Sequence, residues 1–177
     1  MSERPAAKET SSSYHHGDLA QAALETAVKM LEAKGPKGLV LRQIAAELGV
    51  THKAIYRHYA DKETLLAAVA AYGYRALADA VTEAEPSKAR FCAAYIDFAL
   101  ARSALYAFMM ESHAGPSSPA LNEAIRAVID IARQVFEDDD AVKRAWIILH
   151  GGLSLHGAGA LRRRSRDELN AFLCAMI

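Results

Sequence analysis

The sequence predicts an all-α fold of about nine helices, because apolar residues recur at helical spacing along most of the chain. Two further observations favour this class. Alanine is abundant and 52% of the residues are hydrophobic, whereas β-branched residues are sparse. The Asn-Gly and Asp-Gly pairs that form tight hairpins are absent. At 177 residues the chain could hold one mid-sized domain or a small domain followed by a larger one, each with a workable core.

The N-terminal segment, residues 1–13, is polar and has no apolar periodicity, so we expect a disordered arm. A first helix should begin near Asp18, whose acidic side chain suits the start of a helix, and end near Lys34. Its expected inward positions are Leu19, Ala23, Ala27, Met30 and Leu31.

Two short helices joined at a glycine are expected next. Four apolar residues fall on one side of the first of them, namely Leu41, Ile44, Ala45 and Leu48. Gly49 follows directly and can adopt the left-handed backbone that ends a helix. Thr51 can cap the second helix, and Ile55 and Tyr59 form its inner side. With a small residue, Ala45, at the expected crossing point, this pattern is typical of a helix-turn-helix.

The outward side of the motif carries hydrogen-bonding and cationic groups, which suit the base edges and phosphates of a DNA major groove. His52 and Lys53, near the start of the second helix, are best placed for bases. The residues that we expect to touch DNA are Arg42, Thr51, His52, Lys53, Tyr56, Arg57, His58 and Lys62. The alternative is an ordinary pair of short amphipathic helices joined at a glycine.

The stretch from Leu41 to Lys62 resembles the DNA-binding domain of TetR-family transcriptional regulators. The family's recognition helix, which runs into a long fourth helix, is similar to the run of IAAELGV, a capped short helix and IYRHYADKETLL. Its first helix and connector are similar to the upstream stretch YHHGDLAQAALETAVKMLEAKGPKGLVLRQIA. The resemblance implies that Tyr56, His58 and Lys62 contact phosphates. Further on, AWIILHGGLSL, from Ala145 to Leu155, resembles the Trp-His-Gly signature of one C-terminal subfamily.

The arm and the residues after it could add contacts to this surface. Lys8, His15 and His16 could reach phosphates, although histidines before a helix are more often solvated.

A long helix should follow, capped by Asp61 and ended by Pro86. From Ser87 the chain is apolar almost all round, as expected for a buried helix, and it should break near Ser103. The segment Gly115–Pro119 reads as a loop.

Three more helices complete the chain. Ser118 and Pro119 suit the start of one, whose inward positions are Leu121, Ile125, Val128, Ile129, Ala132 and Phe136. Three aspartates, Asp138–Asp140, open the next at its positive end. Ser165 and Glu168 fit a capping box before the last helix, whose inward positions are Leu169, Phe172, Leu173 and Met176.

The helix from Ala141 to about Gly159 is rich in small residues, although a glycine inside a helix costs about 1 kcal/mol. Close approach of another helix would offset that cost, and the resemblance implies that the last two helices pair with their copies in a four-helix dimer interface. The expected interface residues are Gly151, Ser154, Leu155, Ala158, Leu169, Phe172 and Leu173. The alternative is a kinked or frayed helix end at Gly157–Gly159.

Trp146 and His150 lie four residues apart, so they share a helix face, and they match the Trp-His-Gly signature. Aromatic and methionine side chains on other helices could converge on them and line a small-molecule site. The expected ligand-binding residues are Tyr95, Phe98, Phe108, Met109, His113, Trp146 and His150. An ordinary core with a satisfied histidine is the alternative.

Other classes of protein find little support in the sequence. His150 and His156 are spaced for different helix faces, so we expect no metal, and no Ser-His-Asp order or phosphate-binding glycine loop indicates an enzyme or a cofactor. Cys92 and Cys174 lie among apolar neighbours and are expected to be reduced thiols. Without a signal peptide or a membrane-spanning run, we expect a soluble, cytoplasmic protein.

We therefore expect three parts: the arm (1–13), a helix-turn-helix DNA-binding domain (14–60), and a helical effector-binding and dimerisation domain (61–177). The predicted function is a ligand-responsive repressor that acts as a homodimer on a palindromic double-stranded DNA operator and responds to an unknown small-molecule effector. Because formal net charge is zero, DNA affinity must come from a local patch. That neutrality also favours the rival interpretation, an all-α ligand-binding or partner-binding module that no longer reads DNA.

Overall fold

The computed structural model describes residues 18–82, 87–111, 118–161 and 164–177. Within these ranges the chain forms nine α-helices and one short 3-10 helix, and no strand, so the predicted all-α class is confirmed. The helices are α1 (Asp18–Lys34), η1 (Pro36–Gly38), α2 (Leu41–Glu47), α3 (His52–Tyr56), α4 (Lys62–Thr82), α5 (Lys88–Ala101), α6 (Ser103–Glu111), α7 (Pro119–Val135), α8 (Asp139–Gly157) and α9 (Arg166–Cys174). Some of the predictions concern residues outside the described ranges: the 1–13 arm, Lys8, His15, His16, Pro86, His113 and the first part of the Gly115–Pro119 loop.

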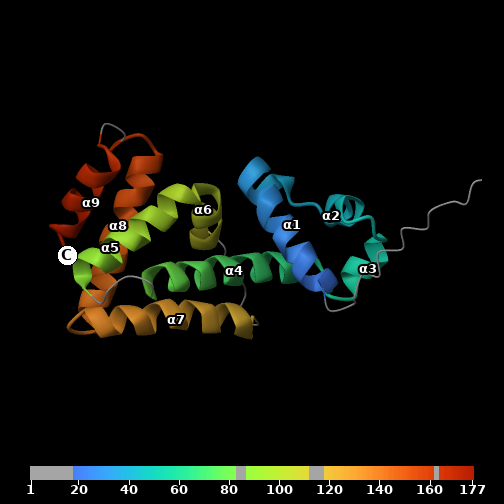
Figure 1. Ribbon diagram of the computed structural model, residues 1–177, viewed down its shortest axis with the longest axis horizontal. Helices are drawn as coiled ribbons and strands as arrows, with labels where there is room; N and C mark the ends of the chain where they lie inside the picture. The colour runs from blue at the N-terminus through green and yellow to red at the C-terminus, as the bar shows by residue number, and fades with distance from the viewer. Residues whose placement is uncertain (1–17, 83–86, 112–117, 162–163) are drawn as a thin grey trace, which may run out of the picture.

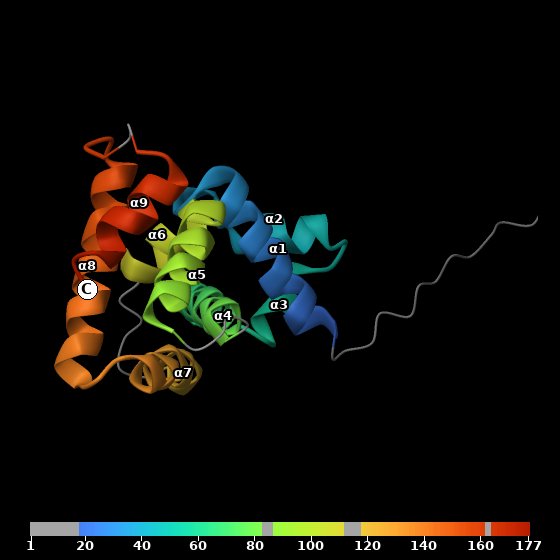
Figure 2. The same cartoon turned by 60° about the vertical axis from the view of Figure 1, so that its left-hand side comes forward.

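The helices are arranged along one long axis (Figure 1). α1, α2 and α3 gather at one end, and α8 and α9 lie at the other, where the chain ends. α4 runs from the first group into the second, and α7 lies alongside it in both views (Figures 1 and 2). A displacement of α8 and α9 can therefore be transmitted to α1, α2 and α3 through α4.

The first group of helices has its own small core. Ile44 of α2 and Ile55 of α3 are fully buried against the inward side of α1, where Ala23, Ala27 and Leu31 are also fully buried. The Tyr59 hydroxyl donates a hydrogen bond of 2.9 Å to the Ala20 carbonyl, which ties the segment between α3 and α4 to α1. Apolar burial and one long-range hydrogen bond thus set how α3 stands on α1.

Local capping explains where α3 and α4 begin. The Ala54 amide donates to the Thr51 hydroxyl at 3.3 Å, and the Thr64 amide donates to the Asp61 carboxylate at 2.7 Å. The hydrogen bonds from Thr64 hold the pKa of Asp61 below its usual range, because they stabilise the charged form. Both caps are as the sequence predicted.

Caps also mark the later helices. Asp138 accepts from the Ala141 amide at 2.7 Å, and Ser165 forms the predicted capping box with Glu168. Ser118 occupies the expected N-cap position before Pro119, but its side chain makes no capping hydrogen bond. The start of α7 is favoured instead by Pro119, whose ring fixes the backbone in a helical conformation at the first turn.

α5 and α6 are separated by a sharp bend. The two helices make an angle of 102° at the break, which lies at Arg102 next to the predicted Ser103. The Arg102 side chain donates to Glu32 of α1 at 2.8 Å and lies 5.3 Å from the centre of the Tyr72 ring of α4. The bend therefore places the Arg102 cation in contact with both α1 and α4.

No single helix within the described ranges is long and apolar enough to cross a membrane. Only α5 and α6 together reach that length and composition, and they are bent against one another.

Close packing of α4 on α6 depends on a glycine. A Cβ atom placed on Gly73 would lie 2.4 Å from the Met109 sulfur and 3.3 Å from Leu105. Met109 is 1% exposed and has little room to withdraw. Any larger residue at Gly73 would push the two helices apart.

α8 and α9 pack against each other inside one chain, which corrects part of the interface prediction. Leu169 and Leu173 are buried in the chain's own core, at 0% and 1% exposure, so they do not face a second copy. A Cβ on Gly152 would lie 2.3 Å from Leu173, so this glycine serves the contact between α8 and α9. The helical period predicted the inward positions Leu169 and Leu173 correctly, but Met176, also expected inward, lies beyond the end of α9 and is 49% exposed. The period also could not say which helix covers the inward face of α9.

Cys92 and Cys174 are free thiols in the structure. Cys92 is buried and Cys174 is half-buried. Burial raises the pKa of the Cys92 thiol to about 12, so it stays protonated and unreactive at neutral pH.

Candidate nucleic-acid interface and internal cavity

The helix-turn-helix has the backbone that its glycine predicted. Gly49 has a φ of 65°, and the Val50 amide donates to the Ala45 carbonyl at 3.0 Å. These features end α2 and redirect the chain into α3. Ala45 is 3% exposed, in keeping with a small side chain where the two helices meet.

All eight residues expected to contact DNA lie on the surface of this end of the molecule. They are Arg42, Thr51, His52, Lys53, Tyr56, Arg57, His58 and Lys62, and each is exposed. Tyr56, at 42% exposure, is held by an edge-on contact with His52, with ring centres 4.6 Å apart. An exposed aromatic side chain fixed by a neighbour is a preorganised group for contact with a partner.

The charge of this surface differs from that of the whole chain. Between Leu41 and Lys62 there are four Lys and Arg residues and two Asp and Glu residues. The chain as a whole has a formal net charge of zero. A local positive excess of this kind is what phosphate contact requires.

A cavity of about 340 Å³ lies between α4, α5, α7 and α8. Its wall is mainly apolar, and its lining includes Leu77, Phe91, Ile125, Val128, Ile129 and Leu149. Tyr74, Tyr95 and Trp146 add aromatic rings. The volume falls within the range of about 300–1,000 Å³ that is typical of small-molecule sites.

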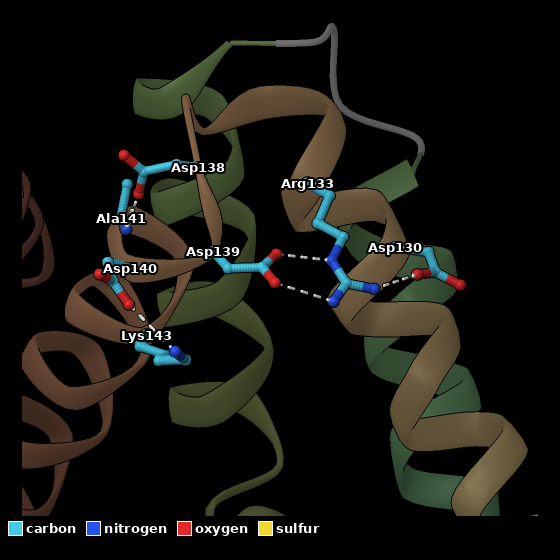
Figure 3. Close-up of polar contacts among 7 residues, drawn as sticks. All are labelled: Asp130, Arg133, Asp138, Asp139, Asp140, Ala141 and Lys143. Atoms are coloured by element: carbon cyan, nitrogen blue, oxygen red, sulfur yellow. Dashed lines mark hydrogen bonds and ion pairs between the residues drawn. The ribbon is translucent and has the colours of Figure 1, made fainter.

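An ion-pair cluster lies at the edge of this cavity, where α7 turns into α8 (Figure 3). Arg133 donates to Asp139 at 2.9 and 3.3 Å and to Asp130 at 3.0 Å, and Lys143 donates to Asp140 at 3.0 Å. Arg133 holds the pKa of the Asp139 carboxyl below its usual range. The cluster ties the end of α7 to the start of α8.

A second cavity, of about 400 Å³, lies between the α5–α6 bend and α8. Its lining is more polar and includes Ser103, Tyr106, His150 and His156. The Tyr106 hydroxyl lies 3.1 Å from Nδ1 of His150 and 3.3 Å from the hydroxyl of Tyr95. This row of polar groups stands between the two cavities.

The structure separates the residues that were expected to form one ligand site. Tyr95 and Trp146 line the first cavity, whereas His150 lines the second. Phe98, Phe108 and Met109 line neither cavity, contrary to the prediction, because they are buried at 7%, 7% and 1% exposure among other helices.

The residues that the sequence argument missed come mainly from α7 and α4. Ile125, Val128 and Ile129 had been interpreted only as a packing stripe, and Tyr74 and Leu77 only as the inner side of a long helix. The α7 residues are only partly buried, whereas residues in a filled core would be fully buried. Periodicity alone shows which way a side chain points, but not whether the space in front of it is filled.

An apolar surface on α8 remains uncovered. Trp146, Ile147 and Leu155 are 55%, 67% and 52% exposed. Added Cβ atoms on Gly151 and Gly157 would meet nothing within 4 Å. This α8 surface, unlike the side that carries Gly152, has no partner within the described part of the chain.

The His, Cys, Asp and Glu side chains of the described ranges form no group of three that could hold a metal ion. His150 instead contacts Tyr106, and His156 lies 3.3 Å from the Leu161 carbonyl.

Sequence comparison identifies the family. Bacterial regulatory proteins of the tetR family match residues 23–69, and the tetracyclin repressor-like C-terminal domain matches residues 89–177. The chain belongs to the TetR family. It therefore has the fold of a transcriptional regulator, and the predicted family resemblance is confirmed; membership of the Trp-His-Gly subfamily remains a prediction. No curated protein matches the chain.

Solved structures agree with this assignment to the TetR family. A protein of unknown function from Rhodococcus sp. RHA1 is 33% identical, with a TM-score of 0.76 over 93% of this chain and 95% of that one. A TetR-family regulator from Shewanella sp. PV-4 is 20% identical, with a TM-score of 0.66 over 89% and 95% of the two chains. BioQ, solved with its natural double-stranded DNA operator, is 26% identical, with a TM-score of 0.52 over 92% and 99%.

Proposed function

We propose that this TetR-family protein is a cytoplasmic, ligand-responsive repressor that binds a palindromic operator as a homodimer. The observation that carries the proposal is the exposed, locally cationic surface of α2, α3 and the start of α4, on a helix-turn-helix whose core is well packed. The complex of BioQ with its operator supports DNA as the partner.

The expected DNA contacts divide into two kinds. His52 and Lys53, at the start of α3, suit base edges, whereas Tyr56, His58 and Lys62 suit phosphates. Arg42, Thr51 and Arg57 complete the proposed surface. We place the boundary of this domain after residue 60, immediately before α4 begins.

Ligand response is proposed from the position of α4. Tyr74 and Leu77 of α4 line the first cavity, and the same helix begins at Lys62 beside the proposed DNA contacts. A molecule that fills the cavity would press on α4 and tilt the helix-turn-helix at its other end. The Arg102 contact with Glu32 offers a second connection, from the α5–α6 bend to α1.

Dimerisation is proposed through the uncovered α8 surface. Gly151 and Ser154 would let a second helix approach closely, and Ile147, Leu155 and Ala158 would supply apolar contact. Phe172 of α9 is half-buried and can contribute at the edge. Two DNA-reading heads could then occupy successive major grooves about 34 Å apart.

A mobility-shift assay with the DNA upstream of the protein's own gene tests the proposal. We expect a specific shift at modest salt and loss of sequence discrimination in Lys53→Ala, at a cost of about 1–3 kcal/mol per lost base contact. No specific shift at any salt concentration would instead support the rival function, a ligand-binding or partner-binding module. The zero net charge of the chain is the observation that favours that rival.

A further inference from the structure

We propose that the cavity between α4, α5, α7 and α8 accepts an uncharged, predominantly apolar molecule and rejects organic anions. This inference rests on the proposed ligand response and specifies the chemistry of the effector. It follows from three features of the cavity: its wall, the state of its phenol groups, and the pairing of charges at its edge.

The buried part of the wall offers no counter-charge to an ion. Aliphatic and aromatic side chains from α4, α5, α6, α7 and α8 form the wall, and its three charged residues, Arg133, Asp139 and Lys143, are exposed. An ion that enters an apolar site loses its hydration, which costs several kcal/mol unless an opposite charge or hydrogen bonds replace the water. A neutral molecule avoids this cost and gains the burial of its apolar surface.

The phenol groups of the wall are neutral and already have partners. The Tyr74 hydroxyl donates to the Met109 carbonyl at 3.4 Å, and the Tyr95 hydroxyl pairs with that of Tyr106 at 3.3 Å. Burial raises the pKa of Tyr74 and Tyr95, so neither ionises near neutral pH. They can add a hydrogen bond to a ligand, but they cannot balance its charge.

The charges at the edge are paired, and carboxylates outnumber cations. Arg133 is shared between Asp139 and Asp130, Lys143 contacts Asp140, and Asp138 caps α8 (Figure 3). An anion would find both cations occupied and excess carboxylates nearby. A cation would meet those carboxylates only at the solvent-exposed edge, where water and salt weaken the attraction.

Three aromatic probes of similar size test the inference on the full-length protein. N-phenyl-1-naphthylamine is uncharged, 8-anilinonaphthalene-1-sulfonate adds a sulfonate to the same skeleton, and 9-aminoacridine is a cation at neutral pH. We expect the neutral probe to bind at least about tenfold more tightly than its sulfonate, and more tightly than the cation, by fluorescence titration. Equal or tighter binding of either ion would overturn the inference.

A filling variant shows whether the probe occupies this cavity. Ile129→Trp places a larger ring in the wall and should weaken binding of the neutral probe by about tenfold or more, as expected when volume is removed from a site. The matched control is Gln134→Trp, on an exposed part of α7 outside the cavity, which should bind as the parent does. Unchanged binding by a folded Ile129→Trp variant would place the probe elsewhere and refute the assignment.

A charge variant provides a second test that does not depend on filling the cavity. Val128→Asp puts a carboxylate in the wall, and Val128→Asn puts an uncharged amide of the same shape there. The Asp variant should bind 9-aminoacridine more tightly than the Asn variant does, and the neutral probe less tightly. The absence of any difference between the two variants would show that the wall does not set charge preference.

DNA binding is measured separately, so the two proposals can fail independently. A protein that selects the neutral probe but never shifts operator DNA would refute the proposed repressor and retain the cavity chemistry. A protein that shifts operator DNA but binds the sulfonate best would refute the cavity chemistry and retain the proposed repressor.

Discussion

Lys62 occupies the first position of α4, at the junction between the helix-turn-helix and the rest of the molecule. Its side chain is exposed, and we propose that it contacts a phosphate. A lysine that neutralises one phosphate releases about one counterion on binding. Such a contact contributes affinity for every DNA sequence alike.

We predict that Lys62→Ala weakens binding to all DNA sequences and lowers the slope of log K against log salt by roughly one unit. Fluorescence anisotropy over a series of salt concentrations measures that slope. Lys143→Ala is the control and should leave the slope unchanged, because Lys143 belongs to α8, which lies at the opposite end of the molecule from α2 and α3. An unaltered slope in Lys62→Ala would exclude Lys62 as a phosphate contact.

Tyr106 stands between the two cavities and is 6% exposed. Burial raises its pKa to about 12, against 10.0 for an ordinary tyrosine. The folded chain therefore keeps the phenol proton at pH values where the unfolded chain has released it. The resulting stability is complete below about pH 10 and is lost as the pH rises towards 12.

We predict that the free energy of unfolding falls less steeply between pH 10 and 12 in Tyr106→Phe than in the parent, because one titrating phenol is removed. The difference in slope should reach at most about 1.4 kcal/mol per pH unit. Urea unfolding at several pH values provides the measurement. Parallel pH profiles for the two proteins would contradict the burial of this hydroxyl.

At the scale of the element, α8 has two sides with different roles. The side with Gly152 lies so close to α9 that a Cβ atom on Gly152 would be only 2.3 Å from the Leu173 side chain. The side with Gly151 is open. Two adjacent glycines of the same helix therefore have different reasons to be small, one within the chain and the other at a proposed dimer contact.

We predict opposite effects of alanine at these neighbouring positions. Gly152→Ala should lower the free energy of unfolding by about 1–3 kcal/mol through overpacking against Leu173. Gly151→Ala should stabilise the separated chain by up to about 1 kcal/mol, since alanine favours the helix and meets no neighbour. Chemical denaturation measures the free energy of unfolding of both variants, in an Ile147→Asp background that is designed to keep the copies apart. A Gly152→Ala variant more stable than Gly151→Ala would contradict the described packing.

At the scale of the whole molecule, the proposed dimer surface and the proposed DNA surface lie at opposite ends (Figure 1). α4 runs between them with α7 alongside, and both helices line the first cavity. In the proposed complex, the helix-turn-helix of one copy contacts only half of a palindromic site. Affinity for an operator should therefore depend on residues far from DNA.

We predict that Ile147→Asp separates the dimer, because a carboxylate on the most exposed apolar side chain of α8 would lose its water at the interface. Analytical ultracentrifugation should show a monomer, and operator affinity should fall steeply. Gln134→Asp, an equally charged change on exposed α7, should remain a dimer. A stable Ile147→Asp dimer would move the proposed interface to another surface.

Much of the fold and of the proposed DNA surface could be predicted from the sequence because local physics decides them. Thr51, Asp61 and Ser165 cap helices through hydrogen bonds that span only three residues. Gly49 ends α2 through its own backbone freedom. Once the apolar positions of this short helix-turn-helix are assigned to its core, the remaining side chains must be the exposed ones.

The cavity and the partners of α8 required the tertiary structure, because the distances between helices depend on side chains far apart in the sequence. Trp146 and His150 share a helix, yet neighbouring helices place them at different cavities. Leu173 points inward as its spacing predicts, but only the position of α8 shows that it meets Gly152 and not a second copy. Helical periodicity determines the direction of a side chain, and tertiary packing determines what lies in front of it.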